Sequence, residues 1–283
     1  MIFITGDTHG PNPIGLHSVD GFGKRMNKEY FPEQKEMTRD DFVIICGDFG
    51  GVWNYDSRYD ITGSTFKDKI CLDYGESKEE KYWLDWLSKK NFTLLFCDGN
   101  HENFDRLYRA YPEVDFHGGK AHQLRENVFH LIRGYIFDLC GLSFFTFGGA
   151  RSHDISGGIL RPYEYSTEKD YKAAYKELQD SGTLFRIDHI SWWEKELASE
   201  EEMKRGLDTL FRYNWDVDYV LSHCAPAGIA ALAGISDANR LTQYFEEIRG
   251  RLKFRKWFFG HYHANRQLLG KYIMLYEQIL RVK

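Results

Sequence analysis

Five short apolar runs, each followed directly by a polar segment, constrain the fold of this 283-residue chain. The runs cover residues 2–5, 42–46, 92–97, 219–221 and 257–259. They are rich in Ile, Val and Phe, and runs of this length and composition are typical of buried strands. The polar segments that follow them read GDTHG, GDFGG, DGNHE, SHCAP and GHYH. The pattern therefore predicts strands that end in polar loops.

Helical patterns lie between several of these runs. The expected helices cover residues 78–90, 167–179, 191–213 and 237–249. Residues 128–147 instead indicate paired strands, with a turn near Cys140 and Gly141. Alternating strands and helices are typical of a layered α/β fold, and the strand-rich middle favours a second sheet. We expect one domain over residues 1–283, with surface insertions at about 11–40 and 49–77, where Gly, Asp, Ser, Asn and Lys are frequent.

The charge and cysteine content exclude several classes of protein. A formal net charge of −5 disfavours a broad basic surface, so a nucleic acid partner is possible but not favoured. No run approaches the roughly 18 apolar residues of a membrane span, and the first residues, MIFITGDTHG, lack the pattern of a signal peptide. The five cysteines form no CxxC pair. We therefore expect a cytoplasmic protein with reduced thiols.

Side chains that can bind metal follow every one of the five apolar runs. They are Asp7, His9, Asp48, Asn100, His101, His223, His261 and His263. Ligands of open α/β sheets bind beyond the carboxyl ends of the strands, where distant segments meet. Carboxylate, amide and imidazole donors suit Mn, Fe or Zn, and the lack of thiolates disfavours a closed structural zinc site. Two ions roughly 3.5–4 Å apart need a bridging carboxylate, for which Asp48 is the candidate.

The five blocks, in this order, resemble those of the calcineurin-like metallophosphoesterase superfamily and span residues 6–263. The resemblance implies a four-layer α/β/β/α sandwich of two mixed β-sheets flanked by helices. It also implies a first divalent ion on Asp7, His9, Asp48 and His263, and a second on Asp48, Asn100, His223 and His261. His101 would then be catalytic without binding metal, because in the family it hydrogen-bonds phosphate or protonates the leaving oxygen.

Two further residues are candidates for substrate binding. Arg151 follows the run FFTFGGA, where another strand should end near the cleft, and a planar guanidinium suits phosphate oxygens. The alternative for Arg151 is a surface ion pair, and His153 lies two residues further on. Related phosphoprotein phosphatases and bis-nucleoside tetraphosphate hydrolases usually carry GD-x-x-DRG in the second block. Here Asp48 is followed by FGGVW, so the phosphate-binding arginine of that subgroup is missing.

The predicted activity is hydrolysis of a phosphoester by in-line attack of a metal-bridging hydroxide. We expect a phosphomonoesterase whose substrate is a phosphoprotein, a nucleotide or a small phosphate. The alternatives are a phosphodiesterase or nuclease, or a bis-nucleoside polyphosphate hydrolase. A catalytically silent scaffold is a third possibility, against which the intact ligand set argues. The sequence carries no signal for an oligomeric state.

Overall fold

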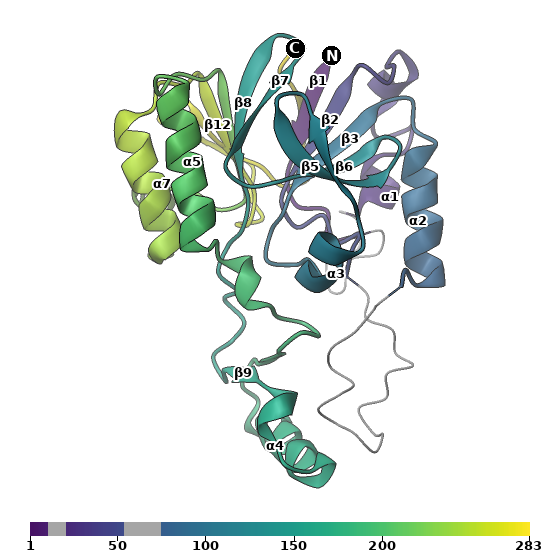
Figure 1. Ribbon diagram of the computed structural model, residues 1–283, viewed down its shortest axis with the longest axis vertical. Helices are drawn as coiled ribbons and strands as arrows, with labels where there is room; N and C mark the ends of the chain where they lie inside the picture. Colours follow the sequence, from purple (N-terminus) through teal and green to yellow (C-terminus); the bar gives the residue numbers. More distant parts are fainter. Residues whose placement is uncertain (11–20, 54–74) are drawn as a thin grey trace.

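The computed structural model of the chain describes residues 1–10, 21–53 and 75–283, and two large mixed β-sheets form its centre (Figure 1). Among the described residues, seven strands form the first sheet. In sheet order they are β15 (Ile279–Arg281), β1 (Ile2–Thr5), β2 (Phe42–Cys46), β3 (Thr93–Cys97), β6 (Val128–Leu131), β5 (Gly119–Arg125) and β4 (Glu113–Phe116). Strands β1, β2, β3 and β6 run parallel, whereas the pairs β15–β1, β6–β5 and β5–β4 are antiparallel.

The second sheet consists of six strands within the described part of the chain. In sheet order they are β13 (Arg266–Leu268), β14 (Tyr272–Met274), β12 (Lys256–Phe259), β11 (Tyr219–Ser222), β8 (Leu142–Phe147) and β7 (Tyr135–Leu139). The four strands β14, β12, β11 and β8 run parallel. The predicted turn at Cys140 and Gly141 is confirmed, because both residues have positive φ and join β7 to β8. The strand-rich middle is nevertheless divided, since β6 pairs within the first sheet.

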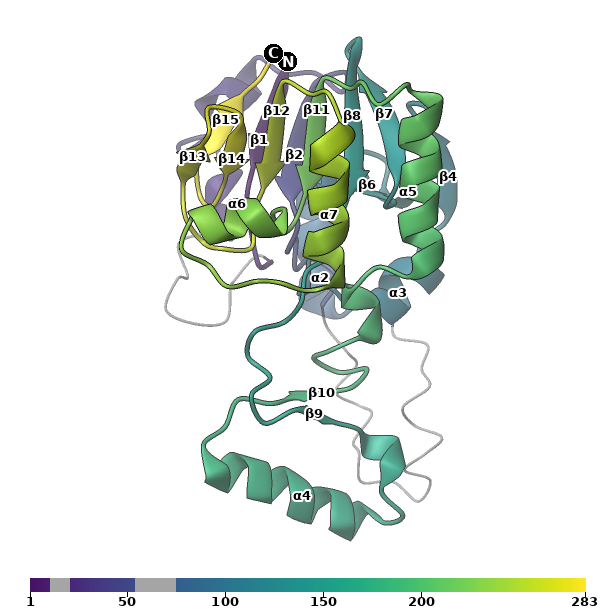
Figure 2. The same ribbon diagram turned by 90° about the vertical axis from the view of Figure 1, so that its left-hand side faces the viewer.

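Helices cover the outer face of each sheet, so the predicted α/β/β/α layering is confirmed (Figures 1 and 2). The first sheet is covered by α1 (Phe22–Arg25), α2 (Lys78–Ser88) and α3 (Phe104–Arg109). The second is covered by α5 (Glu200–Arg212), α6 (Ala227–Leu232) and α7 (Arg240–Arg251). Side chains alternate along each strand: in β1, Ile2 and Ile4 enter the core between the sheets, whereas Phe3 packs toward the helices.

An appendage, residues 151–198, projects from one end of the sandwich (Figures 1 and 2). Its elements are β9 (Ile159–Leu160), the 3-10 turn η2 (Pro162–Glu164), α4 (Glu168–Ser181), β10 (Arg186–Ile187) and the 3-10 turn η3 (Glu194–Glu196). A small apolar cluster around Leu160 and Tyr171 holds it together. The sequence predicted its helix, whose cap Thr167 accepts a hydrogen bond from the Asp170 amide, but not its projection. The expectation of one domain stays a prediction.

Two sequence expectations need correction. The single helix expected over 191–213 is wrong: residues 194–196 form a 3-10 turn, and α5 begins only at Glu200. The reason is a capping box, in which the Ser199 hydroxyl accepts from the Glu202 amide and the Glu202 carboxylate accepts from the Ser199 amide.

The segments expected as surface insertions also contribute to the core. Phe22, Met26, Phe31 and Met37 are buried in the core beside the first sheet, as are Phe49 and Val52. Residues 11–20 and 54–74 of these segments lie outside the described residues. Among the described helices, none is long and apolar enough to cross a membrane.

Candidate metal centre

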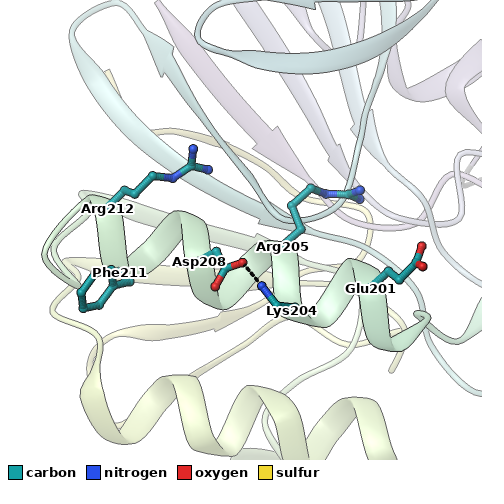
Figure 3. A pocket seen from close by; sticks show the side chains of 6 residues that line it. All are labelled: Glu201, Lys204, Arg205, Asp208, Phe211 and Arg212. Atoms are coloured by element: carbon teal, nitrogen blue, oxygen red, sulfur yellow. Dashed lines mark hydrogen bonds and ion pairs between the residues drawn. The ribbon is translucent and has the colours of Figure 1, made fainter.

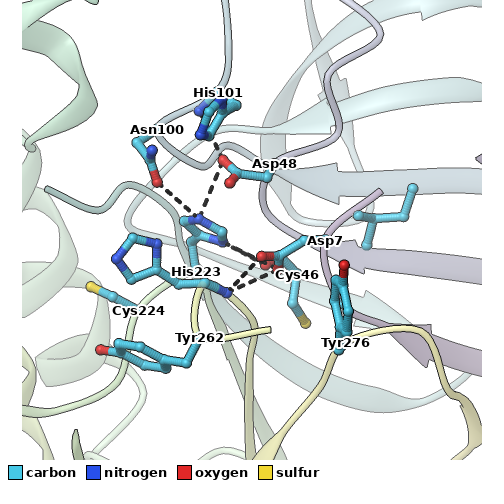
Figure 4. A network of polar contacts seen from close by, with 12 residues as sticks. Asp7, Cys46, Asp48, Asn100, His101, His223, Cys224, Tyr262 and Tyr276 are labelled. Carbon is cyan, nitrogen blue, oxygen red and sulfur yellow. Dashed lines mark hydrogen bonds and ion pairs between the residues drawn. The ribbon is translucent and has the colours of Figure 1, made fainter. Parts of the chain in front are cut away.

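The eight side chains expected to form one site do meet, beyond the carboxyl ends of β1, β2, β3, β11 and β12. Figure 4 labels Asp7, Asp48, Asn100, His101 and His223 among them. A first cluster consists of Asp7, His9 and His263. The His263 Nε2 lies 3.2 Å from Asp7 Oδ2 and 2.9 Å from His9 Nε2. Asp7 is fully buried, whereas the two imidazoles are accessible from outside. The carboxylate of this cluster is therefore shielded from solvent, whereas its two imidazoles can be reached from solvent.

A second cluster consists of Asn100, His223 and His261, and Asp48 lies between the two clusters. The His223 Nε2 lies 3.3 Å from Asn100 Oδ1 and 3.3 Å from Asp48 Oδ1. The other carboxylate oxygen, Asp48 Oδ2, lies 3.8 Å from His9 Nδ1. The His261 ring packs on the His223 ring, with centroids 4.9 Å apart. One carboxylate thus faces both clusters with different oxygens.

The backbone around the site is shaped to bring these groups close. His9, Asp48, His261 and His263 all have φ between 46° and 68°, a conformation that non-glycine residues seldom adopt. Such strain is typical of functional sites, where the surrounding structure holds it in place. Gly260 is required beside them, because a Cβ there would lie 1.9 Å from Asp7 Oδ1. Because Gly260 has no side chain, the amide of the next residue, His261, can donate to both Asp7 oxygens, at 2.9 and 3.0 Å.

Two buried carboxylates, Asp7 and Asp48, carry negative charge in the site in the absence of cations. Burial favours the neutral form of Asp48, but the charge and hydrogen bond of His223 outweigh it and hold the Asp48 pKa well below its usual range. Burial likewise opposes protonation of His223, yet the charges of Asp48 and Asp7 raise the pKa of His223 to about 10. Two buried carboxylates therefore attract positive charge, which a divalent cation would supply by displacing the proton.

The donor set fits divalent cations. Carboxylate, amide and imidazole groups are ligands that Mn, Fe and Zn accept. His223 is also oriented as a ligand, because its Nδ1 donates to the Cys46 carbonyl at 2.9 Å and its Nε2 is left facing Asp48 and Asn100. Such an outer hydrogen bond fixes the tautomer of metal-binding histidines.

Comparison with known proteins agrees with this geometry. The sequence model described as calcineurin-like phosphoesterase matches residues 1–265. The chain belongs to the calcineurin-like phosphoesterase family. A search of curated proteins found no match. Members of this family are metal-dependent hydrolases of phosphoester bonds, so this phosphoesterase is an enzyme that acts on a phosphorylated substrate.

The site of this phosphoesterase also contains a positively charged side chain that the sequence motifs do not indicate. Arg186, at the start of β10 in the appendage, is 7% exposed, and its Nη2 lies 3.2 Å from His101 Nε2. Its Nε and Nη2 donate to the two oxygens of Asp154, at 2.7 and 2.8 Å. Because a guanidinium only donates, His101 Nε2 must accept, so the proton of the neutral ring lies on Nδ1. Burial lowers the pKa of His101 to about 4, which agrees with a neutral ring.

The two candidate substrate-binding residues lie where the appendage leaves β8. Arg151 is exposed and makes no hydrogen bond or ion pair with any other described residue. His153 is also exposed, and its Nε2 lies 2.9 Å from His261 Nε2. Arg25, by contrast, is buried and donates to the carbonyls of Gly6 and Asp7, so it supports the first loop from within.

A shallow hollow on α5 shares no residue with the metal centre (Figure 3). It is lined by Glu201, Lys204, Arg205, Asp208, Phe211 and Arg212. Charges of both signs lie along it, and Lys204 pairs with Asp208. The hollow therefore presents no concentrated charge for a phosphate group.

Proposed function

We propose that this phosphoesterase holds two divalent ions and hydrolyses phosphomonoesters. The first ion is assigned to Asp7, His9, Asp48 and His263, and the second to Asp48, Asn100, His223 and His261. The observation that carries this proposal is the position of Asp48, whose Oδ1 faces His223 and whose Oδ2 faces His9. A carboxylate that faces one cluster with each of its oxygens is the arrangement that a bridging ligand requires.

The bound ions would polarise the phosphoryl group and lower the pKa of a water between them. The protein's own side chains would orient the phosphate between the ions and His101. His101 lies beside Asp48, to which its amide donates at 2.8 Å, and Arg186 holds its ring in one tautomer. We propose that His101 hydrogen-bonds the phosphate; to protonate the leaving oxygen it would first have to take up a proton, because its ring is neutral here. Manganese, iron and zinc are the proposed metals.

The charge near the site supports a monoester as substrate. A terminal phosphate carries about two negative charges near neutral pH, because its second pKa is about 6, whereas a diester carries one. Arg151 offers an exposed guanidinium where the chain leaves β8, and no described residue neutralises it. Arg151 lies two positions before His153, which contacts His261, and a guanidinium that reaches the bound phosphate stabilises the more highly charged monoester. The substrate is accordingly proposed to be a phosphoprotein, a nucleotide or a small phosphate.

A comparison of aryl phosphates tests this function. The purified chain is assayed with Mn²⁺ on mono-aryl and bis-aryl phosphates that share one leaving group. We expect faster turnover of the monoester. Faster turnover of the bis-aryl compound would replace the proposal by a phosphodiesterase, and turnover of neither would favour a silent scaffold.

Arg151→Ala is expected to raise KM about tenfold with little change in kcat. A charge-assisted hydrogen bond contributes about 1.5–3 kcal/mol, and a contact made equally in ground state and transition state affects KM alone. Steady-state kinetics on the mono-aryl phosphate measure this effect. Unchanged kcat and KM would exclude Arg151 from phosphate binding.

Arg186→Lys is expected to lower kcat about tenfold while the metal content stays unchanged. A lysine cannot contact both Asp154 oxygens and His101 from one planar group, so the His101 ring loses its fixed orientation. Arg161→Lys is the matched control, because Arg161 is also an appendage arginine near an aspartate, 3.8 Å from Asp188. An equal fall in both variants would indicate a general effect on the appendage instead.

A further inference from the structure

His153 occupies a fixed position beside the second cluster. Its neighbour Ser152 is buried, and the Ser152 amide and hydroxyl donate to the two oxygens of Glu196, at 2.9 and 2.6 Å. On the other side, Asp154 is held by the guanidinium of Arg186. Both flanking residues are therefore anchored, and the exposed side chain of His153 is directed at His261, with ring centroids 4.8 Å apart.

The distance between the two ring nitrogens is the spacing of two ligands on one ion. His153 Nε2 lies 2.9 Å from His261 Nε2. A metal–nitrogen bond is about 2.0–2.1 Å long, so two nitrogens about 90° apart on one ion lie about 2.9 Å from each other. His9 Nε2 and His263 Nε2, assigned above to the first ion, are also 2.9 Å apart. The two pairs share this nitrogen–nitrogen distance, although the angle between the ring planes is 86° for His9 and His263 and 30° for His153 and His261.

The surroundings of this pair also suit a cation. His153, His261 and the buried carboxylate of Asp237 place one ligand atom each within 4.8 Å of one another. Asp237 accepts from the Tyr262 hydroxyl at 2.8 Å and from the Asn239 amide, so its carboxylate is already oriented by neighbours. We regard Asp237 as a nearby negative charge that favours the ion.

We propose that His153 is a fifth protein ligand of the second ion, so that the appendage completes the metal centre. This inference rests on the proposed function, because it presupposes the ion on Asp48, Asn100, His223 and His261. Five protein ligands exceed the four of a tetrahedral zinc site. The second ion would therefore favour a six-coordinate metal such as Mn²⁺ or Fe²⁺ over four-coordinate Zn²⁺.

His153→Ala tests the proposal through metal binding. The purified full chain is stripped of metal and titrated with Mn²⁺ by calorimetry, with metal content measured in parallel. Bound Co²⁺ is followed by its visible absorption, which becomes more intense as the number of ligands falls. His117→Ala is the control, since His117 is exposed and, within the part of the chain that the structure describes, its ring lies against the Asp138 carbonyl and two phenylalanine rings.

We expect two Mn²⁺ sites in the unmodified chain and in His117→Ala. In His153→Ala we expect one of the two affinities to fall by ten- to a hundredfold or more, since even groups that only support a ligand contribute about that much. The Co²⁺ absorption should intensify in this variant alone. Two unchanged affinities and an unchanged Co²⁺ spectrum would overturn the proposal and leave His153 as a hydrogen-bond partner of His261. An unmodified chain that binds no ion would instead overturn the proposed function.

Discussion

Asp48→Asn is expected to lower kcat at least about a hundredfold and to remove at least one Mn²⁺ from the purified chain. Asparagine keeps the shape of aspartate but has one oxygen and no charge, so it cannot bind an ion on each side. The two sides are occupied by His223, 3.3 Å from Oδ1, and His9, 3.8 Å from Oδ2. The loss of metal-dependent stabilisation of the transition state corresponds to several kcal/mol.

The measurement combines steady-state kinetics with metal analysis after dialysis. Asp218→Asn is the control, because Asp218 directly precedes β11 and so lies at the end of that strand opposite to His223. It should keep both its rate and its metal. A full rate together with full metal content in Asp48→Asn would contradict the bridging role.

The sequence predicted the position of the main site because parallel strands impose it. Once the runs ending before Asp7, Asp48 and Asn100 form neighbouring parallel strands, their following residues must reach the same edge of the sheet. The same holds for the runs that precede His223 and His261 in the second sheet. Hydrophobic runs and polar endings are local features, and local features are what a single sequence displays most clearly.

The contribution of the appendage could not be predicted in this way. Arg186 and Asp154 are 32 positions apart, and the pairing of the short strands β9 and β10 brings their two segments together. Two-residue strands leave no periodic pattern, and neither residue belongs to a recognisable motif. Likewise, the start of α5 depends on the reciprocal hydrogen bonds of Ser199 and Glu202. The continuous helical pattern before them concealed this boundary.

A buried ion pair between Arg133 and Asp98 lies beneath the metal centre, and we expect its loss to have a large effect on stability. Arg133 is fully buried, and its Nε donates to Asp98 Oδ2 at 2.8 Å. His130 Nε2 lies 3.0 Å from the other oxygen, Asp98 Oδ1. The Asp98 carbonyl accepts from the Gly149 amide at 2.8 Å. Asp98 also directly precedes the GNH segment, so it links the Asn100 loop to the segment that carries His153.

Arg133→Met is expected to lower the free energy of unfolding by about 3–5 kcal/mol at pH 7, the cost of leaving a buried charge without its partner. Burial alone would raise the Asp98 pKa, but Arg133 and His130 outweigh it and hold the pKa below its usual range. A carboxylate with a lowered folded-state pKa contributes stability above its unfolded pKa of about 3.9, and this contribution is lost as the pH falls. Without Arg133 the pKa of Asp98 rises. As the pH falls, Asp98 in the variant therefore becomes protonated and no longer carries an unpaired buried charge. The difference in unfolding free energy between the variant and the unmodified chain should therefore be smaller at pH 4 than at pH 7.

Urea unfolding of the metal-free chain at pH 7 and pH 4 measures this difference. Arg255→Met is the control, because the Arg255 side chain is 65% exposed and pairs with Asp218 at the surface, where such pairs contribute about 0–1 kcal/mol. A loss in Arg133→Met of the same size at both pH values would contradict the pH argument and indicate lost packing alone. If the loss of unfolding free energy is smaller at pH 4 than at pH 7, we infer that the ion pair between Asp98 and Arg133 holds the Asn100 loop against the segment that carries His153. Mn²⁺ affinity should then fall in Arg133→Met as well, although Arg133 is not among the proposed ligands.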